Sequence, residues 1–175
     1  LDEIKSENNL LQRIYFMVSD GEPADRLIKN GPIIDPEHFL TIRAIKMYAD
    51  GALGSRGAAL LENYSDYDGR GVFIFLEEDT KPRLTKALNK GIQIGTHAIG
   101  DHGNRVVLDW YEETFSKAKK NNQIFESPRW RIEHSQNITP VDQRRFVELD
   151  IIPSMQPSHA IGDLHFAVER LGLER

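Results

Sequence analysis

Three side chains able to bind or bridge metal ions occupy matching places in the sequence: Lys46, His97 and His134. Each lies late in a short run rich in apolar residues, and a turn follows shortly after it. Such runs are typical of buried parallel strands, and α/β proteins gather their reactive side chains at the carboxyl ends of those strands. We therefore expect the three side chains to share one site.

The two histidines favour a metal site over a structural role. A single buried histidine is more often a hydrogen-bonded structural residue than a ligand, but two at successive strand ends shift the balance. Neutral imidazole binds zinc and related divalent ions. The sequence has no cysteine, which excludes thiolate ligands and disulfides. The sequence therefore predicts a divalent metal, with zinc as the first candidate.

Two interpretations are open for Lys46. A protonated ammonium repels a metal, so Lys46 can be a structural residue at the edge of the core, paired with an acid. Alternatively, CO₂ carboxylates its amine. The resulting carbamate is an anion whose two oxygens can bridge two divalent ions, the arrangement used in two-metal hydrolysis.

Residues 50–57, Asp-Gly-Ala-Leu-Gly-Ser-Arg-Gly, form a glycine-rich segment after a predicted strand. In one interpretation, the segment is a turn whose glycines permit positive φ. In the other, it binds a phosphate, although it lacks the Lys-Ser/Thr ending of a P-loop. Arg56 is a candidate for orienting a substrate carboxylate or carbonyl. Gln156 and His159, after the last predicted strand, are further candidates for substrate contact. Asp101 is expected to cap the helix that follows it.

Strands and helices alternate about five times along the chain. The expected strands cover residues 10–19, 42–49, 92–98, 130–134 and 151–156. The expected helices cover residues 24–30, 79–91, 104–120, 139–149 and 164–171, with a loop at 31–38, a long connection at 50–79 and a short extended piece at 72–76. This alternation predicts an α/β fold with a parallel sheet and covering helices.

Reactive side chains at several successive strand ends favour a (β/α)₈ TIM barrel over a doubly wound sheet. A whole barrel needs roughly 250 residues, so 175 residues would form part of one. The chain begins with Leu1 and ends without a closing element. We expect residues 1–175 to be a single piece of a longer catalytic barrel.

Charge and hydropathy exclude some classes of partner. The net charge of −5 and the lack of a Lys/Arg run argue against nucleic acid. No apolar stretch has the length of a membrane span, and none resembles a signal peptide, so we expect no membrane partner and take the cytoplasm as the default compartment.

Four segments resemble, in the same order, the amidohydrolase superfamily and its branch similar to N-substituted formamide deformylase. They are residues 46–56 (KMYADGALGSR), 96–101 (THAIGD), 131–136 (RIEHSQ) and 154–157 (SMQP). The resemblance covers nearly the whole chain and would place it from the third to the seventh strand of the barrel. It implies a binuclear metal centre with Lys46 as the carboxylated bridging lysine and with His97 and His134 as ligands from the next two strands.

The resemblance further implies a parent hydrolase that acts on an amide or other non-peptide C–N bond of a small-molecule substrate, through a metal-activated water. The family's first-strand His-x-His pair and eighth-strand Asp are absent from this sequence. We therefore expect this chain alone to hold no stable binuclear centre and to be inactive. The alternatives are a non-catalytic module derived from the barrel and a phosphate-binding barrel enzyme that uses residues 50–57.

A partial barrel would leave two sheet edges unpaired, at residues 10–19 and 151–156. It would also uncover an apolar inner face, to which we assign Trp130 and Ile132. Open edges and apolar patches promote pairing between chains. A homo-oligomer formed through the exposed edges is therefore a possible partner arrangement.

Overall fold

The computed structural model of this chain describes residues 12–37, 39–123, 125 and 127–175. Five strands form a parallel sheet in sequential order, and a sixth, very short strand pairs with β3. The strands are β1 (Ile14–Ser19), β2 (Ile33–Ile34), β3 (Leu40–Tyr48), β4 (Gln93–Ala98), β5 (Arg131–His134) and β6 (Ile152–Met155). The helices are α2 (Glu22–Asn30), α3 (Glu77–Asn89), α4 (Asp101–Lys120), α5 (Pro140–Glu148), α6 (His159–Gly162) and α7 (Ala167–Leu171).

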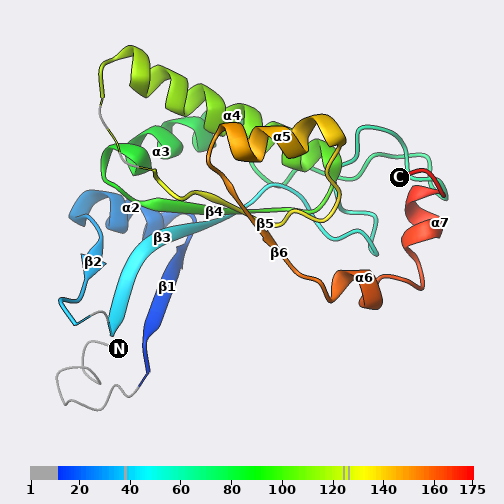
Figure 1. The fold of residues 1–175 in the computed structure, drawn as a ribbon, viewed down its shortest axis with the longest axis horizontal. Helices are drawn as coiled ribbons and strands as arrows, with labels where there is room; N and C mark the ends of the chain where they lie inside the picture. Colours follow the sequence, from blue (N-terminus) through cyan, green and yellow to red (C-terminus); the bar gives the residue numbers. More distant parts are fainter. Residues whose placement is uncertain (1–11, 38, 124, 126) are drawn as a thin grey trace.

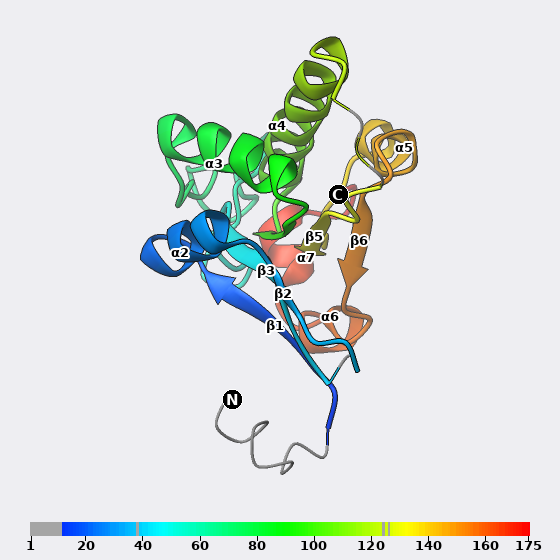
Figure 2. The same cartoon turned by 90° about the vertical axis from the view of Figure 1, so that its left-hand side faces the viewer.

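The strands follow an open arc, and α2, α3, α4 and α5 lie on its outer side (Figures 1 and 2). The order β1-β3-β4-β5-β6 is sequential, and each neighbouring pair is parallel. This confirms the predicted architecture, part of a (β/α)₈ barrel with five parallel strands and outer helices. In the part of the chain that the structure describes, no helix is both long and apolar enough to cross a membrane.

Alternation along the strands decides which side chains meet the helices. Ile45 and Met47 of β3 are buried in the same core cluster as Ile94 of β4. Successive side chains of a strand point to opposite faces, so Lys46 lies on the face away from the helices. The neighbouring β4 residue there is Gly95. The sequence pattern thus places an apolar face outward and a polar face inward.

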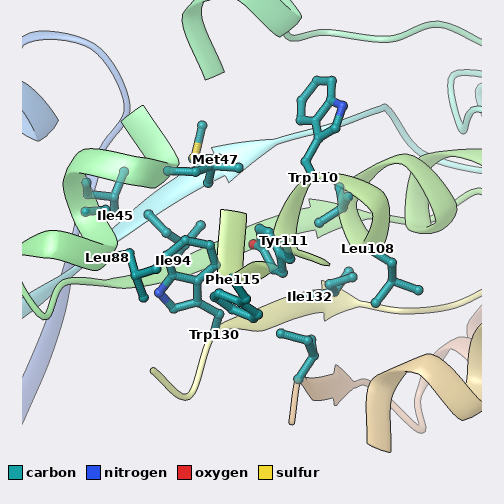
Figure 3. Close-up of a cluster of buried hydrophobic side chains, with 14 of the residues drawn as sticks. Ile45, Met47, Leu88, Ile94, Leu108, Trp110, Tyr111, Phe115, Trp130 and Ile132 are labelled. Carbon is teal, nitrogen blue, oxygen red and sulfur yellow. The ribbon is translucent and has the colours of Figure 1, made fainter. Parts of the chain in front are cut away.

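The core on the helix side is built around Trp130 (Figure 3). Its ring lies 4.8 Å from that of Tyr111 and 4.9 Å from that of Phe115, both on α4, and its Nε1 donates to the carbonyl of Ile92. Trp130 and Ile132 are fully buried there. The prediction that these two residues belong to an uncovered inner face was therefore wrong, because α4 covers them.

One strand was not expected. Ile33 and Ile34 of β2 pair antiparallel with Ile42 and Thr41 of β3, in a segment predicted to be a loop. The pairing between β3 and β4 starts only at Ala44, so the first residues of β3 keep a free edge that β2 occupies. The register of neighbouring strands, which local sequence does not encode, creates this short strand. Residues 10 and 11 of the expected first strand lie outside the described residues.

Several helix boundaries also differ. The α3 helix begins at Glu77 instead of Asp79 or Thr80, so Pro82 lies inside it. Of the expected helix at 164–171 only Ala167–Leu171 is helical, as α7, and the short helix α6 before it was not expected.

The N-termini of α5 and α4 are capped in different ways. Thr139 caps α5, because its side chain accepts from the backbone N–H of Asp142. Asp101 does not cap α4, whose N-cap is Gly100. One carboxylate oxygen of Asp101 instead accepts from the backbone N–H groups of Leu61 and His102. The acid therefore ties the long connection after β3 to the start of α4.

Candidate active site

The carboxyl ends of β3, β4 and β5 bring together the three metal-capable side chains found in the sequence. The rings of His97 and His134 meet edge to face, with their centroids 4.5 Å apart. The ring of Tyr48 lies 5.6 Å from that of His97, and Nζ of Lys46 lies 3.8 Å from the centre of the same tyrosine ring. The four side chains thus form one continuous group, which we call the strand-end cluster.

His134 joins this cluster through an unusual backbone conformation. Strand alternation alone would place it with Ile132 on the helix side. However, His134 has φ 74° and Ser135 has φ 45°. A left-handed conformation costs roughly 1–2 kcal/mol for a residue other than glycine, and such strain is concentrated at functional sites. β5 ends at this bend, and the imidazole lies against His97.

His97 is held in its neutral form. Burial lowers its pKa to about 4, with smaller contributions from nearby His134 and Lys46 and an opposing one from the Gly51 carbonyl. Its Nε2 lies 3.4 Å from that carbonyl oxygen and 3.5 Å from Oδ1 of Asp50. Neutral imidazole is the form that binds metal.

Lys46 is half-buried in a weakly polar setting. Its Nζ donates to the carbonyl of Met47 at 3.0 Å. Burial lowers its pKa to about 8, and Glu133 opposes this shift. The lowered pKa increases the fraction of neutral amine near pH 7, and the neutral amine is the nucleophilic form of lysine. Glu133 itself is bound by the guanidinium of Arg131, at 2.5 and 2.8 Å.

Asp50 is a residue that the sequence reasoning missed. It is buried, and its carboxylate accepts from the backbone N–H groups of Ala59, Ile99 and Gly100 at 2.8 to 2.9 Å. Burial raises its pKa to about 6, although the three N–H donors act in the opposite direction. The signal in the sequence was an acid directly after an apolar run and before a glycine. Asp50 fastens the connection after β3 to the turn after β4.

Two further candidates from the sequence join the cluster. Oε1 of Gln156 contacts Nδ1 of His134, and the ring of His159 lies 5.7 Å from that of His134. Both residues follow β6, so a fourth strand end contributes to the same group.

Arg56 has a different environment. Its guanidinium makes two hydrogen bonds to Asp66, at 2.7 and 3.1 Å, and Asp66 also binds Arg170 of α7. Arg56 therefore joins two parts of the connection after β3, and Asp66 links that connection to the last helix.

Several backbone N–H groups in and next to residues 50–57 are bound within the loop itself. The N–H of Gly51 donates to the carbonyl of Gly57, and the N–H groups of Gly57 and Ala58 both donate to that of Ala52. A phosphate loop needs N–H groups that point at the ligand. The three N–H groups named here are used within the loop, so they do not point at a ligand.

The donor types fit a divalent metal, but their number falls short of a complete site. His97 and His134 supply two imidazoles, whereas a catalytic zinc site uses three protein ligands. Among the described residues, no group of three or more His, Cys, Asp or Glu side chains is placed to hold a metal. These two histidines, with Lys46, would therefore provide part of a ligand set.

Comparisons with known proteins agree with this geometry. A family model described as "Amidohydrolase family" matches residues 3–175. Protein LONG AFTER FAR-RED 3 of Arabidopsis thaliana is 34% identical over 152 residues, which are 86% of this chain and 25% of that protein. Putative amidohydrolase YtcJ of Bacillus subtilis (strain 168) is 30% identical over 138 residues, covering 78% of this chain and 25% of the relative.

Two solved structures share the fold. An uncharacterized metal-dependent hydrolase from Pyrococcus furiosus has a TM-score of 0.84 and 28% identity. The match covers 99% of this chain and 34% of the Pyrococcus furiosus chain. A second uncharacterized metal-dependent hydrolase, from Pyrococcus horikoshii OT3, has a TM-score of 0.82 and 30% identity. The match covers 98% of this chain and 33% of the Pyrococcus horikoshii chain. The chain thus spans about a third of the solved relatives and a quarter of the curated ones. It belongs to the amidohydrolase family and has the fold of part of a metal-dependent hydrolase barrel.

Proposed function

We propose that this chain supplies part of the metal site of a hydrolase that cleaves an amide or other non-peptide C–N bond in a small molecule. The observation that carries the proposal is the contact between His97 and His134 at adjoining strand ends. Their ring centroids are 4.5 Å apart, and Lys46 lies in the same cluster. The family match and the metal-dependent hydrolases of the same fold support it.

The hydrogen bonds of the two histidines leave one nitrogen of each available. Oε1 of Gln156 can only accept, so Nδ1 of His134 donates to it and Nε2 keeps its lone pair. Nε2 of His97 faces two acceptors, the Gly51 carbonyl and Asp50, so this nitrogen carries the proton and Nδ1 keeps its lone pair. Outer partners of this kind orient ligand histidines in metal sites.

His97, His134 and Lys46 would hold a divalent metal, with zinc as the first candidate and a binuclear centre if Lys46 is carboxylated. The metal would supply Lewis acidity and lower the pKa of a bound water. This chain's own contribution is to keep His97 neutral, to fix both imidazoles through Gln156 and Asp50, and to hold Lys46 partly buried. Ligands from elsewhere in the parent protein would complete the set.

The test uses the protein expressed over its whole reading frame. We expect bound divalent metal after dialysis, measured by elemental analysis, and hydrolysis of at least one member of an amide panel. Removing a residue that only supports a metal ligand typically lowers metal affinity or activity 10–100-fold, and removing the ligand itself should cost at least as much. His97→Asn and His134→Asn should therefore each lose metal and reduce kcat/KM by at least about 100-fold.

His165→Asn is the matched control, because this histidine is exposed and lies outside the strand-end cluster. It should retain both metal and activity. Hydrolysis by a metal-free wild type, or full metal content in both cluster variants, would contradict the proposal. A folded whole protein with neither metal nor hydrolysis would favour the non-catalytic module instead.

A further inference from the structure

A cavity of about 440 Å³ lies between the carboxyl ends of β5 and β6 and the last two helices, α6 and α7. Buried Leu53 and Leu171 line it. Met155, Leu164 and Val168 also line it and are 60, 66 and 54% exposed. Large apolar side chains gathered around one hollow at this exposure are typical of a binding site.

The cavity opens onto the strand-end cluster. His134 and Gln156 line it, and they are in contact with each other. His159 lines it as well, with its ring 5.7 Å from that of His134. A molecule whose reacting group lies at His134 would therefore place a neighbouring group inside this cavity.

The wall formed by α6 and α7 is fastened to the rest of the chain. Asp163, between the two helices, accepts from Nε2 of Gln136 at 2.5 Å. Nε of Arg170 on α7 donates to the carbonyl of Gly54 at 3.2 Å. The cavity is thus formed before any ligand binds, as small-molecule sites usually are.

We propose that this cavity is a substrate subsite for an uncharged apolar group, an aliphatic chain or a ring, next to the scissile bond. Its volume lies within the range of small-molecule sites, about 300–1,000 Å³, which are mostly apolar with a few polar groups. No Lys or Arg is among the described residues that line it, so an anionic group would find no basic side chain there, and the acid that lines it, Asp163, already accepts from Gln136. This inference rests on the proposed function, because it places the reacting bond at His134.

The first test is a binding measurement that needs no turnover. The chain has three methionines, of which Met155 lines the cavity and Met47 is buried in the core. Methyl-labelled methionine in the whole protein gives separate signals, and Met155→Leu identifies the relevant one. Cyclohexanol, an apolar probe without a hydrolysable bond, should shift the Met155 signal saturably and leave that of Met47 in place.

The second test changes the cavity's size. Ala160 lines the cavity and is exposed, so Ala160→Phe narrows it without burying a new side chain. A single methylene in an apolar pocket alters discrimination by about 10- to 200-fold, and Phe adds a larger group than that. We expect Ala160→Phe to weaken cyclohexanol binding at least about tenfold and to lower kcat/KM for long-chain amides more than for acetamides. Val147→Phe, at an exposed position of α5 outside the cavity, is the control and should change neither.

An unshifted Met155 signal, or equal affinity in wild type and Ala160→Phe, would overturn the subsite. So would contacts between Met155 and another part of the polypeptide in the absence of probe, because the cavity would then be filled internally. Different results would contradict the proposed function and the subsite. Cyclohexanol binding in a protein that hydrolyses no amide would contradict the hydrolase, and hydrolysis indifferent to acyl length would contradict the subsite alone.

Discussion

Oδ1 of Asp50 lies 3.5 Å from Nε2 of His97, while the same carboxylate binds three backbone N–H groups. One buried acid therefore positions a candidate ligand and joins two strand-end connections. The hydrogen bonds reach nine residues along the chain to Ala59 and fifty residues to Gly100. The geometry around His97 depends on this residue.

Asp50→Asn should destabilise the protein by roughly 2–3 kcal/mol, because hydrogen bonds to a charged group contribute about 1.5–3 kcal/mol and an amide nitrogen cannot accept them. Denaturant unfolding of the whole protein measures the loss. Asp79→Asn, on the exposed start of α3, is the control and should stay within about 0.5 kcal/mol of wild type. Equal stability of the two variants would show that the Asp50 contacts contribute little.

Gly100→Ala tests how closely the turn after β4 approaches the connection after β3. A Cβ at Gly100 would lie 1.9 Å from the carbonyl oxygen of Ala59, a backbone atom that cannot rotate away. We expect a loss of about 2 kcal/mol or more, at the upper end of overpacking costs. Gly162→Ala is the matched control, since a Cβ there meets no atom within 4 Å. Melting temperatures of the two variants should differ clearly, and matching values would refute the close approach.

Trp130→Ala should cost about 3–5 kcal/mol, as for other fully buried aromatic residues that are truncated. The indole is 0% exposed, packs against Tyr111 and Phe115, and donates to the Ile92 carbonyl. Val147→Ala, at a residue that is 83% exposed, serves as control. A loss below about 1 kcal/mol for Trp130→Ala would mean that α4 does not cover β5 in solution.

Asp142 should make stability depend on pH in the acid range. Burial alone would raise its pKa, but hydrogen bonds from Arg105 and Thr139 outweigh burial and hold the pKa below its usual value. The folded protein therefore binds this proton less readily than the unfolded chain, so the stabilisation is complete above about pH 4–5 and is lost as pH falls further.

The variant Asp142→Asn separates this effect from general acid denaturation. At pH 7 it should be less stable than wild type by about 2 kcal/mol, because Arg105 and Arg145 lose a charged acceptor. The difference should shrink as pH falls from about 5 towards 3. A constant difference over that range would contradict the lowered pKa of Asp142.

Much of the fold follows from local sequence patterns. Apolar runs gave the strands around Lys46 and His97, and Thr139 followed by Pro140 gave the start of α5. These features depend on strand propensity, hydrophobic period and capping, which act over a few residues. The sequential parallel order followed from the alternation of strands and helices.

Other features depend on contacts between distant segments. β2 forms because β3 extends beyond β4, and Asp50 bonds to N–H groups far along the chain. The orientation of His134 comes from positive φ at the end of β5, whereas alternation would place it with Ile132. Arg56 looked available in the sequence, but Asp66 binds it. Local patterns do not encode such long-range partners.

The central claim is that His97 and His134 hold one divalent metal, using the nitrogens that their other hydrogen bonds leave free. Crystals of the whole protein, grown with zinc and measured on both sides of the zinc absorption edge, test it most directly. We predict an anomalous peak about 2.0–2.1 Å from Nδ1 of His97 and from Nε2 of His134. A zinc peak bound elsewhere, or none at these two nitrogens in a zinc-saturated crystal, would contradict the claim.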